Sequence, residues 1–594
     1  MLPFDDSRRL TGSNLFFAST GAVLEVIGVT PDDALLSAWR TRVDRARARL
    51  GWLTPGVVAR VHAHGASLAI AAPFDLLFLA TEVNEWALCS AVYERDPMRW
   101  SGLQDALLAA ALADATDPAS VLPPVLNEPD AFARFQRLAD REHRPDLCQL
   151  VAAGAARGLP HMLDETELTL GAGAGGRSFP LTALPSVSVV PWDELHDIPT
   201  AVVTGSNGKT TTVRLLAACA RARGWRTAYN CTDGVFIDNQ ALATGDYSGP
   251  AGARRVLRER RTEAAILETA RGGILRRGIA VSRAQVAVVT NVSSDHFGEY
   301  GIHDLAALAE VKLTVAAIVA PDGLLVLNAD DAQLRAKASG LASRFGTCPP
   351  LGWFALDADL DLLRAHRTQS GSTCGVRGGR LYLSRGAVEH DLGSVAAMPL
   401  SIGGFARYNI ANLAGAALAA AALGIPPATI SAVYAAFGAR IDHNPGRMMR
   451  FDVGGVQVLL DYAHNPDGLR GFLAVAQQLR GAKGRLGMLL GHAGNRQDAD
   501  IEDLARVAAE FRPDLVVVKE IGTHLRGRAP GEVPRIIRAA LLAAGLPESA
   551  VLTQDSEIEA ASCALDWARP GDVLGLLVHA TSARAAVLAM LKNR

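Results

Sequence analysis

The sequence Thr204-Gly-Ser-Asn-Gly-Lys209-Thr-Thr-Thr212 lies between a strand-like run, Thr200-Ala-Val-Val203, and a helix-like run from Val213 to Arg223. This order of strand, glycine-containing loop and helix is typical of a phosphate-binding loop, because backbone N–H groups and the helix N-terminus then face an anion. In such loops the lysine reaches the terminal phosphates and the first threonine binds Mg²⁺. The stretch therefore predicts a nucleoside triphosphate site with the binding residues Gly205, Asn207, Gly208, Lys209, Thr210 and Thr211.

Lysine is rare in this chain, because nearly all of its 59 basic residues are arginines. The lysines are Lys209, Lys312, Lys337, Lys483, Lys519 and Lys592. A lysine retained inside a motif is a candidate for chemistry that the planar, always charged guanidinium group of arginine does not perform. Lys209 and Lys312 stand out on this argument, whereas Lys337 and Lys592 are expected to be ordinary surface residues.

Length and composition limit the class of protein. A chain of 594 residues is too long for one hydrophobic core, so three or four domains are expected. The net charge of −2 gives no reason to expect a nucleic-acid or membrane partner. No apolar run approaches the ~20 residues of a membrane span, and the N-terminus lacks a secretion signal, so a cytoplasmic protein is expected. The seven scattered cysteines indicate reduced core residues rather than disulfides or a zinc site.

Between about residues 200 and 330, short β-rich runs alternate with helical patterns. This alternation predicts parallel strands joined by crossover helices. Polar residues follow the strands in order, at Thr204, Glu268, residues 291–296 and residues 328–331. Because ligands bind beyond the carboxyl ends of parallel strands, these residues are expected to converge on one crevice.

Other regions flank this block. A second doubly wound α/β unit is predicted from about Phe451 onward, and residues 350–400 have the pattern of a β-rich loop region. An Ala-rich helix is predicted from Ile410 to Leu423. Residues 1–195 contain helical patterns but no catalytic motif that chemistry alone identifies. The expected domains are residues 1–195, 196–447 and 448–594.

Glu268 and His296 are candidate metal ligands. Glu268 ends a buried-looking strand and precedes Thr-Ala-Arg-Gly-Gly273, a loop that allows a metal or phosphate to approach. A lone glutamate there would more often be a solvated charge, but the strand order and the glycines favour metal binding. An isolated histidine would more often be a satisfied surface or core residue. The position of His296 after a hydrophobic strand and beside Asp295 favours a functional role.

The loop has the short form Gly-x-x-Gly-Lys-Thr-Thr, in which Val203 takes the place of the usual first glycine. This form resembles the Mur ligase superfamily of ATP-dependent ligases. The resemblance implies that Thr210, Glu268 and His296 are magnesium ligands, and that Asn291 belongs to the nucleotide site. Lys312 lies where many Mur ligases carry a lysine carbamylated by carbon dioxide, a change that converts a cation into a metal-binding carboxylate.

Three later segments follow in the order of that family. Gly404-Phe-Ala-Arg-Tyr-Asn409-Ile-Ala-Asn412 resembles the helix start that contacts adenine, although Tyr408 replaces the commoner histidine. Asn409 would otherwise be a plain helix cap. Pro445-Gly-Arg447 and Asp461-Tyr-Ala-His-Asn-Pro466 imply that Arg447 lies near the γ-phosphate and Asp461 near the ribose. The implied fold is a Mur-ligase-like central P-loop α/β domain with a parallel sheet, a C-terminal Rossmann-like α/β domain and an N-terminal α+β domain.

A finer resemblance is to the C-terminal ligase half of cyanophycin synthetases. It is carried by Leu267-Glu-Thr-Ala-Arg-Gly-Gly-Ile-Leu-Arg276, Lys519-Glu520 and Leu525-Arg-Gly-Arg-Ala-Pro-Gly-Glu532. In those enzymes an ATP-grasp domain of a few hundred residues separates the N-terminal part from the Mur-type part. Here about thirty residues separate Gly173 from the phosphate loop. The ATP-grasp catalytic body is therefore expected to be missing, which leaves one ATP site.

The resemblance implies an ATP- and Mg²⁺-dependent ligase that activates a carboxylate as an acyl phosphate and joins it to an amine. It further implies an arginine-like amino acid and an aspartate-type carboxylate in a small molecule or peptide, with a separate ATP-grasp ligase and a homo-oligomer as candidate partners. The alternatives are a Mur-type ligase for an unrelated acid and a catalytically silent scaffold that binds an ATP-grasp synthetase. The retention of Lys209, Glu268, His296 and Lys312 together argues against a silent protein.

Overall fold

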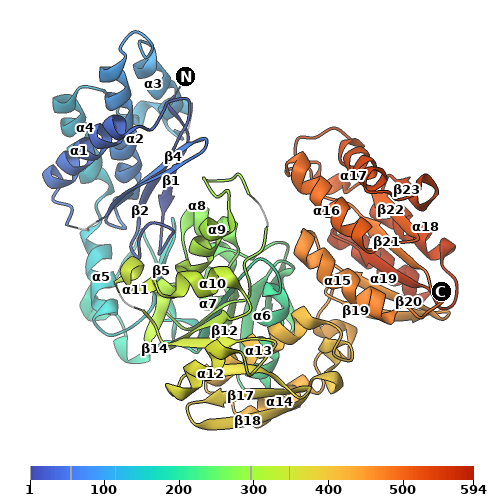
Figure 1. Ribbon diagram of the computed structural model, residues 1–594. Helices are drawn as coiled ribbons and strands as arrows, with labels where there is room; N and C mark the ends of the chain where they lie inside the picture. The colour runs from blue at the N-terminus through green and yellow to red at the C-terminus, as the bar shows by residue number, and fades with distance from the viewer. Residues whose placement is uncertain (1, 54–55, 114, 295–296, 347) are drawn as a thin grey trace.

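The strand β8 (Thr200–Thr204), which leads into the predicted phosphate loop, is an inner strand of the largest sheet (Figure 1). The computed structural model describes residues 2–53, 56–113, 115–294, 297–346 and 348–594. Within these ranges the sheet has eleven strands. In sheet order they are β11 (Gln240–Thr244), β10 (Gly234–Ile237), β9 (Thr227–Cys231), β12 (Ala264–Glu268), β8, β13 (Ala284–Val289), β14 (Val319–Asn328), β15 (Leu351–Phe354), β16 (Ser372–Arg377), β17 (Arg380–Arg385) and β18 (Val388–Ser394).

The inner strands from β9 to β16 pair in parallel, and antiparallel hairpins extend both edges. The predicted parallel sheet is therefore confirmed, but it is wider than the sequence indicated. The β-rich region between residues 350 and 400 is not a separate loop region, because β15 to β18 continue the same sheet.

Helices cover both faces of this sheet, as the alternation of its side chains requires. Val202 packs into one hydrophobic cluster and its neighbour Val203 into the other. The Val203 face is covered by α6 (Lys209–Ala222), α13 (Arg407–Ala422) and α14 (Pro427–Tyr434). The Val202 face is covered by α7 (Pro250–Arg258), α8 (Arg271–Arg277), α9 (Leu305–Lys312), α10 (Ala332–Ala338), α11 (Leu341–Phe345) and α12 (Asp361–Thr368).

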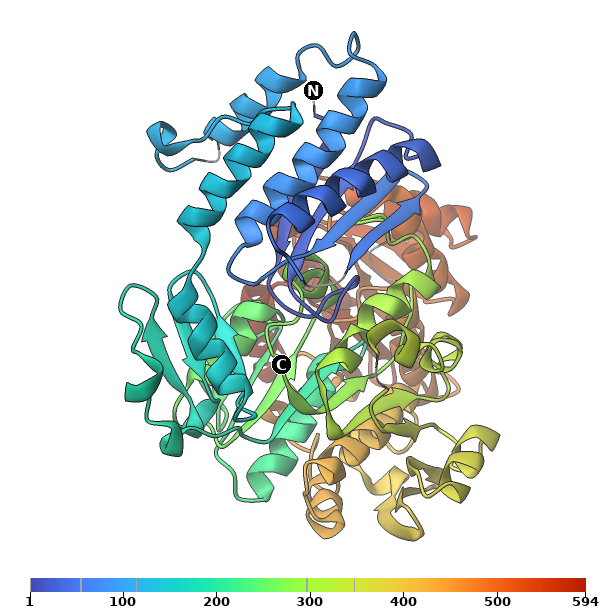
Figure 2. The same cartoon turned by 90° about the vertical axis from the view of Figure 1, so that its left-hand side faces the viewer.

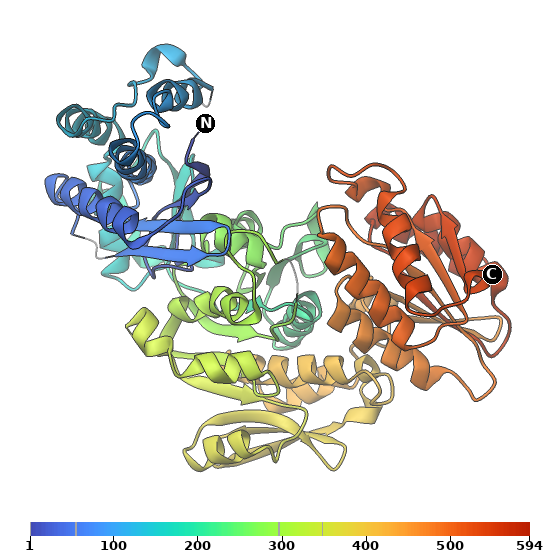
Figure 3. The ribbon, with the colours of Figure 1, turned by 45° about the horizontal axis from the view of Figure 1, so that its top comes forward.

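The C-terminal part is a second doubly wound unit, and it lies on the opposite side of the central sheet from the N-terminal part (Figures 1 and 3). Its sheet order is β19 (Met449–Val453), β20 (Val456–Asp461), β24 (Val573–Leu577), β21 (Leu486–Leu490), β22 (Leu515–Lys519) and β23 (Val551–Gln554). Its strands pair in parallel except at the β19–β20 edge. Its helices are α15 (Pro466–Leu479), α16 (Asp498–Glu510) and α17 (Glu532–Ala543) on one face, and α18 (Glu557–Trp567) and α19 (Thr581–Lys592) on the other.

The N-terminal part is an α+β unit that lies above the central sheet in Figure 2. Its antiparallel sheet has the order β1 (Phe4–Leu10), β2 (Gly21–Val26), β4 (Gly65–Ala71) and β3 (Val57–His62). Its helices are α1 (Asp33–Arg49), α2 (Leu77–Arg95), α3 (Leu103–Ala113), α4 (Glu128–Glu142) and α5 (Pro145–Ala155). A small sheet of β5 (His161–Leu163), β6 (Glu167–Leu170) and β7 (Arg177–Pro180) follows.

Direct bonds join the N-terminal sheet to the central part. Arg8 donates to the carbonyl of Leu275 at 3.0 Å, and Arg60 forms a 3.1 Å ion pair with Glu310. We propose domains at residues 1–195, 196–447 and 448–594, because the sheets and hydrophobic clusters change close to these boundaries.

Two further predictions concern membrane-spanning helices and the burial of the cysteines. Among the described residues, no helix combines the length and apolar character needed to cross a membrane. The prediction of core cysteines fits Cys89, Cys219, Cys231 and Cys374, which are buried. It is wrong for Cys348, which is exposed, and Cys148 and Cys563 are half-buried.

Candidate active site

The phosphate loop connects β8 directly to α6, and the backbone conformation of its glycines determines its shape. Gly205 and Gly208 have φ values of +146° and +82°, which favour glycine. A Cβ atom on Gly208 would lie 2.2 Å from Oδ1 of Asn412, and one on Gly205 would lie 1.9 Å from Oγ1 of Thr290. Both positions therefore exclude a side chain, and the loop lies directly against α13 and the end of β13.

Lys209 is the first residue of α6, and its side chain folds back over the loop. Its Nζ donates to the carbonyl of Gly205 at 3.0 Å and to that of Ser206 at 2.9 Å. An ammonium group in this position faces the same cavity as the loop amides. The geometry suits a cation that exchanges two carbonyl contacts for the oxygens of a bound anion.

The carboxylate of Glu268, at the end of β12, is buried beside the first turn of α6. Thr210 Oγ1 donates to its Oε2 at 2.8 Å and Thr232 Oγ1 donates to its Oε1 at 3.1 Å. Burial raises the pKa of Glu268 above its ordinary value, and the nearby charge of Lys209 opposes that rise. The arrangement gathers hard oxygen donors around one buried anionic group, which is the donor set that Mg²⁺ prefers.

Residues that follow β13 brace the loop from its other side. Asn291 accepts from the backbone N–H of Asn207 at 2.9 Å and donates back to the Asn207 carbonyl at 3.1 Å. Ser293 receives the side-chain amide of Asn207 at 3.0 Å. The predicted residue Asn291 therefore contacts the loop itself. His296 lies outside the described residues, so its predicted place in the site has no structural account.

The C-terminal unit, with Arg447 in the segment that leads into it, supplies the opposite wall. Arg447 stacks over the ring of Tyr462 at 4.4 Å, and the buried carboxylate of Asp461 accepts backbone N–H groups from Met448, Tyr462 and Ala463 at 2.6 to 2.8 Å. Burial raises the pKa of Asp461, and the charge of Arg447 works against that rise. The wall begins at the carboxyl end of β20, so the two parallel sheets present corresponding edges to each other.

A hydrogen bond and an ion cluster connect the two walls. Asn465 donates its side-chain amide to Oδ1 of Asn207 at 2.9 Å, which connects the start of α15 to the phosphate loop. Asp233 accepts Arg214 and Arg584 at 2.6 Å each, one arginine from each unit. Burial works to raise the pKa of Asp233, but Arg447, Arg214 and Arg584 together lower it.

These elements enclose a cavity of about 900 Å³. It is lined by the predicted residues Gly205, Asn207, Gly208, Lys209, Thr210, Thr211, Glu268, Asn291, Lys312, Asn409, Asn412, Arg447 and Asp461. Lys312 is buried, with 2% of its surface exposed, which its sequence motif did not indicate. The structure brings these residues together, while the individual role of each stays a prediction.

The cavity also contains residues that the sequence analysis did not select. They are Asp246, Arg276, Glu299, His464, His492, Asn495, Arg496, His524, Arg526 and His579, together with Arg271. Arg271 pairs with Glu299 at 2.5 Å, and it lies in the Arg-Gly-Gly flank of Glu268. Arg276, His464 and Arg526 also lie in segments that the sequence analysis quoted for the family resemblance, but the others come from parts of the chain with no such signal.

The fold and this cavity define a protein of two α/β units whose facing walls enclose a phosphate-type loop and a buried carboxylate. The Mur ligase middle domain matches residues 203–420, and the Mur ligase glutamate ligase domain matches residues 446–577. A UDP-N-acetylmuramoyl-L-alanyl-D-glutamate–2,6-diaminopimelate ligase from Xanthomonas campestris is 30% identical over 61% of this chain and 70% of that protein. The chain belongs to the Mur ligase family.

Cyanophycin synthetases are also similar to this chain. The protein of Trichormus variabilis is 35% identical over 68% of this chain and 43% of that protein. The match therefore spans less than half the length of that relative. Among solved structures, the match to E. coli FolC in complex with DHPP and ADP covers 67% of this chain and 89% of the FolC chain, with 18% identity and a TM-score of 0.47.

Proposed function

We propose that this protein is an ATP- and Mg²⁺-dependent ligase that joins an arginine-like amino acid to an aspartate-type carboxylate through an acyl phosphate. Membership of the Mur ligase family supports an ATP-dependent amide ligase in general. The observation that carries the proposal is the cavity between the two α/β units, which combines a phosphate loop, a buried carboxylate and several arginines. Such a site can stabilise charge that develops on phosphoryl oxygens.

The phosphate loop and Lys209 bind the triphosphate in this proposal. Amides at the start of α6 face the cavity, and the helix N-terminus adds its positive dipole end. Lys209 leaves its carbonyl partners and contacts the terminal phosphate. Asn409 and Asn412, at the start of α13, lie beside the loop and hold the nucleoside end.

Glu268 and Thr210 are the proposed magnesium ligands, and His296 joins them by family resemblance. The buried carboxylate and its two hydroxyl neighbours fit a hard divalent cation, because a buried anion with a raised pKa regains stability when a cation binds. The ion supplies charge neutralisation on the phosphates when bound. Thr232 then orients Glu268 through Oε1, the oxygen that Thr210 does not contact.

Arginines near the cavity are suited to two further tasks. Arg447 and Arg271 neutralise the phosphoryl group and the substrate carboxylate, because a planar guanidinium group binds both oxygens of such groups. Residues of the C-terminal unit that line the cavity, such as Asn495 and Arg526, lie on the side where the incoming amino acid is proposed to bind. Closure of this unit over ATP would exclude water from the acyl phosphate.

The substrate class rests on resemblance to cyanophycin synthetases, and the short interval before the phosphate loop supports the absence of an ATP-grasp body. A chain with one ATP site would need a second enzyme to extend a backbone of aspartates. We therefore propose a separate ATP-grasp ligase as a functional partner.

Phosphate release measured with ATP, Mg²⁺ and arrays of amino acids and aspartyl peptides tests the function. The expected result is turnover that requires both an aspartate-type carboxylate and an amine, most strongly arginine. A Lys209→Met variant provides the background rate. Turnover with a different acid would support a Mur-type ligase of unrelated specificity. Absence of turnover with any acceptor, together with tight binding of an ATP-grasp synthetase, would support the scaffold alternative.

We further propose that Lys312 is carbamylated. The neutral amine would combine with carbon dioxide to give a carbamate anion and one proton, and this anion would add a carboxylate at the buried lining of the cavity. Intact-mass spectrometry under bicarbonate and activity measured with and without bicarbonate test this step. An unmodified amine in the active, Mg²⁺-bound protein would contradict it.

A further inference from the structure

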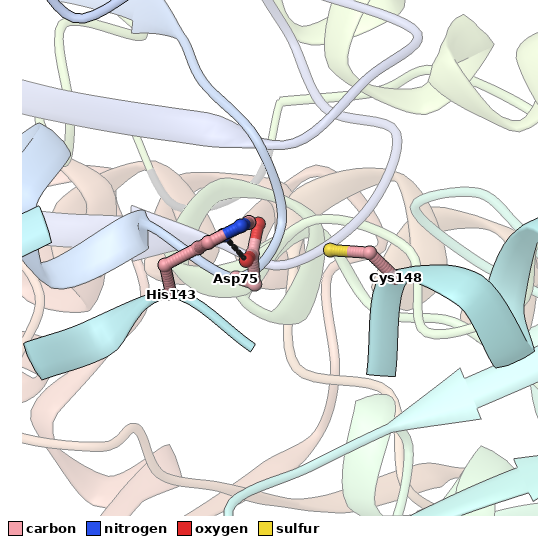
Figure 4. Close-up of side chains that lie close together, drawn as sticks. All are labelled: Asp75, His143 and Cys148. Carbon is pink, nitrogen blue, oxygen red and sulfur yellow. Dashed lines mark hydrogen bonds and ion pairs between the residues drawn. The ribbon is translucent and has the colours of Figure 1, made fainter. Parts of the chain in front are cut away.

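Three side chains of different chemistry meet in the N-terminal part, far from the cavity. Asp75 precedes α2, His143 directly follows α4, and Cys148 lies in the first turn of α5. One ligand atom from each lies within 4.8 Å of the other two. Figure 4 shows the sulfur of Cys148 pointing toward the paired Asp75 and His143 from the side of α5.

The carboxylate of Asp75 is held in a fixed orientation. Its Oδ2 lies 2.7 Å from Nδ1 of His143 and accepts the backbone N–H of Arg144 at 3.1 Å. The side chain of Asp75 is 2% exposed, whereas that of His143 is 51% exposed. The cluster therefore has a rigid, buried base and opens to solvent on the imidazole side, which gives an ion a path of entry.

The local charge favours a cation. The negative charges of Asp75 and Asp146 both disfavour the thiolate form of Cys148. The Arg144 guanidinium donates to the carbonyl of Leu181 and pairs with Asp146 at 3.5 Å, so it offsets the charge of Asp146 and not that of Asp75. Burial, followed by the charge of Asp75, raises the pKa of Cys148 to about 12. An activated cysteine nucleophile needs a lowered pKa, so this cluster does not have the character of a thiol catalyst.

We propose that Asp75, His143 and Cys148 bind Zn²⁺, with water in the fourth position. A thiolate, an imidazole and a carboxylate form the mixed ligand set that zinc accepts, whereas Mg²⁺ and Ca²⁺ select oxygen ligands alone. On binding, Cys148 gives its proton to solvent and its sulfur bonds to the metal. This assignment revises the expectation from cysteine spacing, because the ligands are separated by up to 73 positions (75 to 148) and share no motif.

The proposed ion would tie two hydrophobic clusters together. Leu138 of α4 belongs to the core of the N-terminal sheet, whereas Leu147 of α5 belongs to the cluster around β6. Asp75 lies beside Phe74, which packs against that second cluster. A metal held from both sides would fix α5 and the small sheet relative to the N-terminal unit.

Metal titration of the full-length, chelator-stripped protein tests the site. Co²⁺ is the first probe, because a cysteine ligand adds a thiolate-to-cobalt charge-transfer band that oxygen ligands do not give. We expect one equivalent of Co²⁺ to produce this band and one equivalent of Zn²⁺ to displace it. Saturating Mg²⁺ is present throughout, so that oxygen sites in the ATP cavity are occupied.

Variants locate the binding. Cys148→Ser is expected to abolish the band, and His143→Asn to weaken binding by at least ~10-fold. Cys563→Ser is the matched control, since Cys563 is also half-buried but lies in the C-terminal unit, and it should leave the titration unchanged. A wild-type protein without the band, or a band that persists in Cys148→Ser, would overturn the proposal.

Thermal unfolding gives a second, independent readout. Because an ion that binds the native state stabilises it by mass action, Zn²⁺ should raise the melting temperature of the wild type and leave that of Cys148→Ser unchanged. If circular dichroism shows that Cys148→Ser is unfolded without metal, His143→Asn replaces it, since the half-exposed imidazole is less needed for packing. An equal rise in wild type and variant would contradict the site.

Discussion

Glu268 and Glu557 are both buried in α/β units that border the same cavity, yet their pKa values shift in opposite directions. Burial raises the pKa of Glu268, whose two oxygens accept from the neutral hydroxyls of Thr210 and Thr232. Burial also works to raise the pKa of Glu557, but His579 and the charge of Lys519 lower it well below its ordinary value. Glu557 also accepts the backbone N–H groups of His579 and Ala580.

The difference lies in the partners: Glu557 is paired with a buried cation, whereas the two oxygens of Glu268 contact neutral hydroxyls, which fits the proposed magnesium site. Lys519 is fully buried, and its Nζ contacts Glu557 and, at 3.1 Å, Nδ1 of His579. The C-terminal triad is thus complete without a ligand. In the central unit, burial disfavours the charged form of Glu268, yet this carboxylate is retained where oxygen atoms face the cavity. Buried charge is therefore informative about function only when its partners are counted.

The largest effect is expected on ATP turnover, from a change at Lys209 in the phosphate loop of the central unit. Lys209→Arg retains the positive charge but replaces a compact ammonium that fits between the carbonyls of Gly205 and Ser206. We expect ATP turnover to fall on the order of 10³-fold with the melting temperature nearly unchanged. Lys337→Arg, which alters a half-exposed ion pair with Glu310, is the control and should retain activity. Near-normal turnover in Lys209→Arg would show that charge alone suffices in the loop.

The next prediction concerns the stability of the C-terminal wall. Lys519→Met leaves Glu557 buried without its cation, so the C-terminal unit should lose ~3–5 kcal/mol of unfolding free energy. Lys592→Met, at an exposed position of the same unit, should change little. The double variant Lys519→Met with Glu557→Gln should recover much of the loss, because the unpaired charge is removed. Denaturant unfolding followed by circular dichroism measures these differences.

The pH dependence of the same pair has a defined sign. Because the folded pKa of Glu557 is depressed, its contribution is fully present above its ordinary pKa of 4.5 and is lost as the pH falls toward the folded value. His579 has a pKa lowered to about 4 by burial and by Lys519, so in the folded protein it stays neutral down to about pH 4, whereas in the unfolded chain it takes up a proton near its ordinary pKa of 6.5. Unfolding of the C-terminal unit should therefore become easier as the pH falls below about 6.5, and more steeply below about 4.5, where the contribution of Glu557 is also lost.

Glu268→Gln gives the complementary result in the central wall. Activity should fall ~10²-fold because the proposed magnesium ligand is replaced by a neutral amide. The protein should nevertheless resist heat better at pH 7, since the folded pKa of Glu268 is raised and its ionised form costs stability above that value. This gain should shrink as the pH falls toward 4.5 and disappear below it, where the wild-type carboxyl is protonated in both the folded and the unfolded state. A melting temperature lowered at pH 7 would contradict the assigned difference between the two glutamates.

The sequence predicted the position of Glu268 in the central unit, but it did not predict the buried cluster around Glu557 in the C-terminal unit. Strand order and glycine spacing located Glu268 at the end of a parallel strand, because the signals for β8, β12 and α6 are local and periodic. Lys519 was identified only as part of a segment that resembles cyanophycin synthetases. Its burial depends on Glu557 and His579, which lie 38 and 60 positions away.

The N-terminal part shows the same limit. β2 and β4 are short apolar runs that pair across 45 residues, so no single window reveals their sheet. Asp75, His143 and Cys148 are three ordinary residues until α2, α4 and α5 pack together. Chemistry that depends on tertiary contacts between distant segments leaves no spacing for sequence reasoning to detect.

The smallest expected effect concerns the bond between the walls. Asn465 caps α15 through Oδ1, which accepts the N–H of Gly468 at 2.8 Å, while its amide donates to Asn207 in the phosphate loop. Asn465→Asp retains the cap acceptor and removes the donor, and it places a carboxylate against Oδ1 of Asn207. We expect the KM for ATP to rise about 5- to 10-fold, equivalent to about 1 kcal/mol, with the melting temperature nearly unchanged.

The matched control for this bond is Asn127→Asp, which alters an exposed cap of α4 in the N-terminal part and should leave the KM unchanged. Steady-state phosphate release at varied ATP measures both variants. If the C-terminal wall acts only after closure, kcat should fall together with the rise in KM, because the loop would lose its alignment in the closed state. An unchanged KM and kcat in Asn465→Asp would mean that the two walls act independently, and the cavity would then be a nucleotide site of the central unit alone.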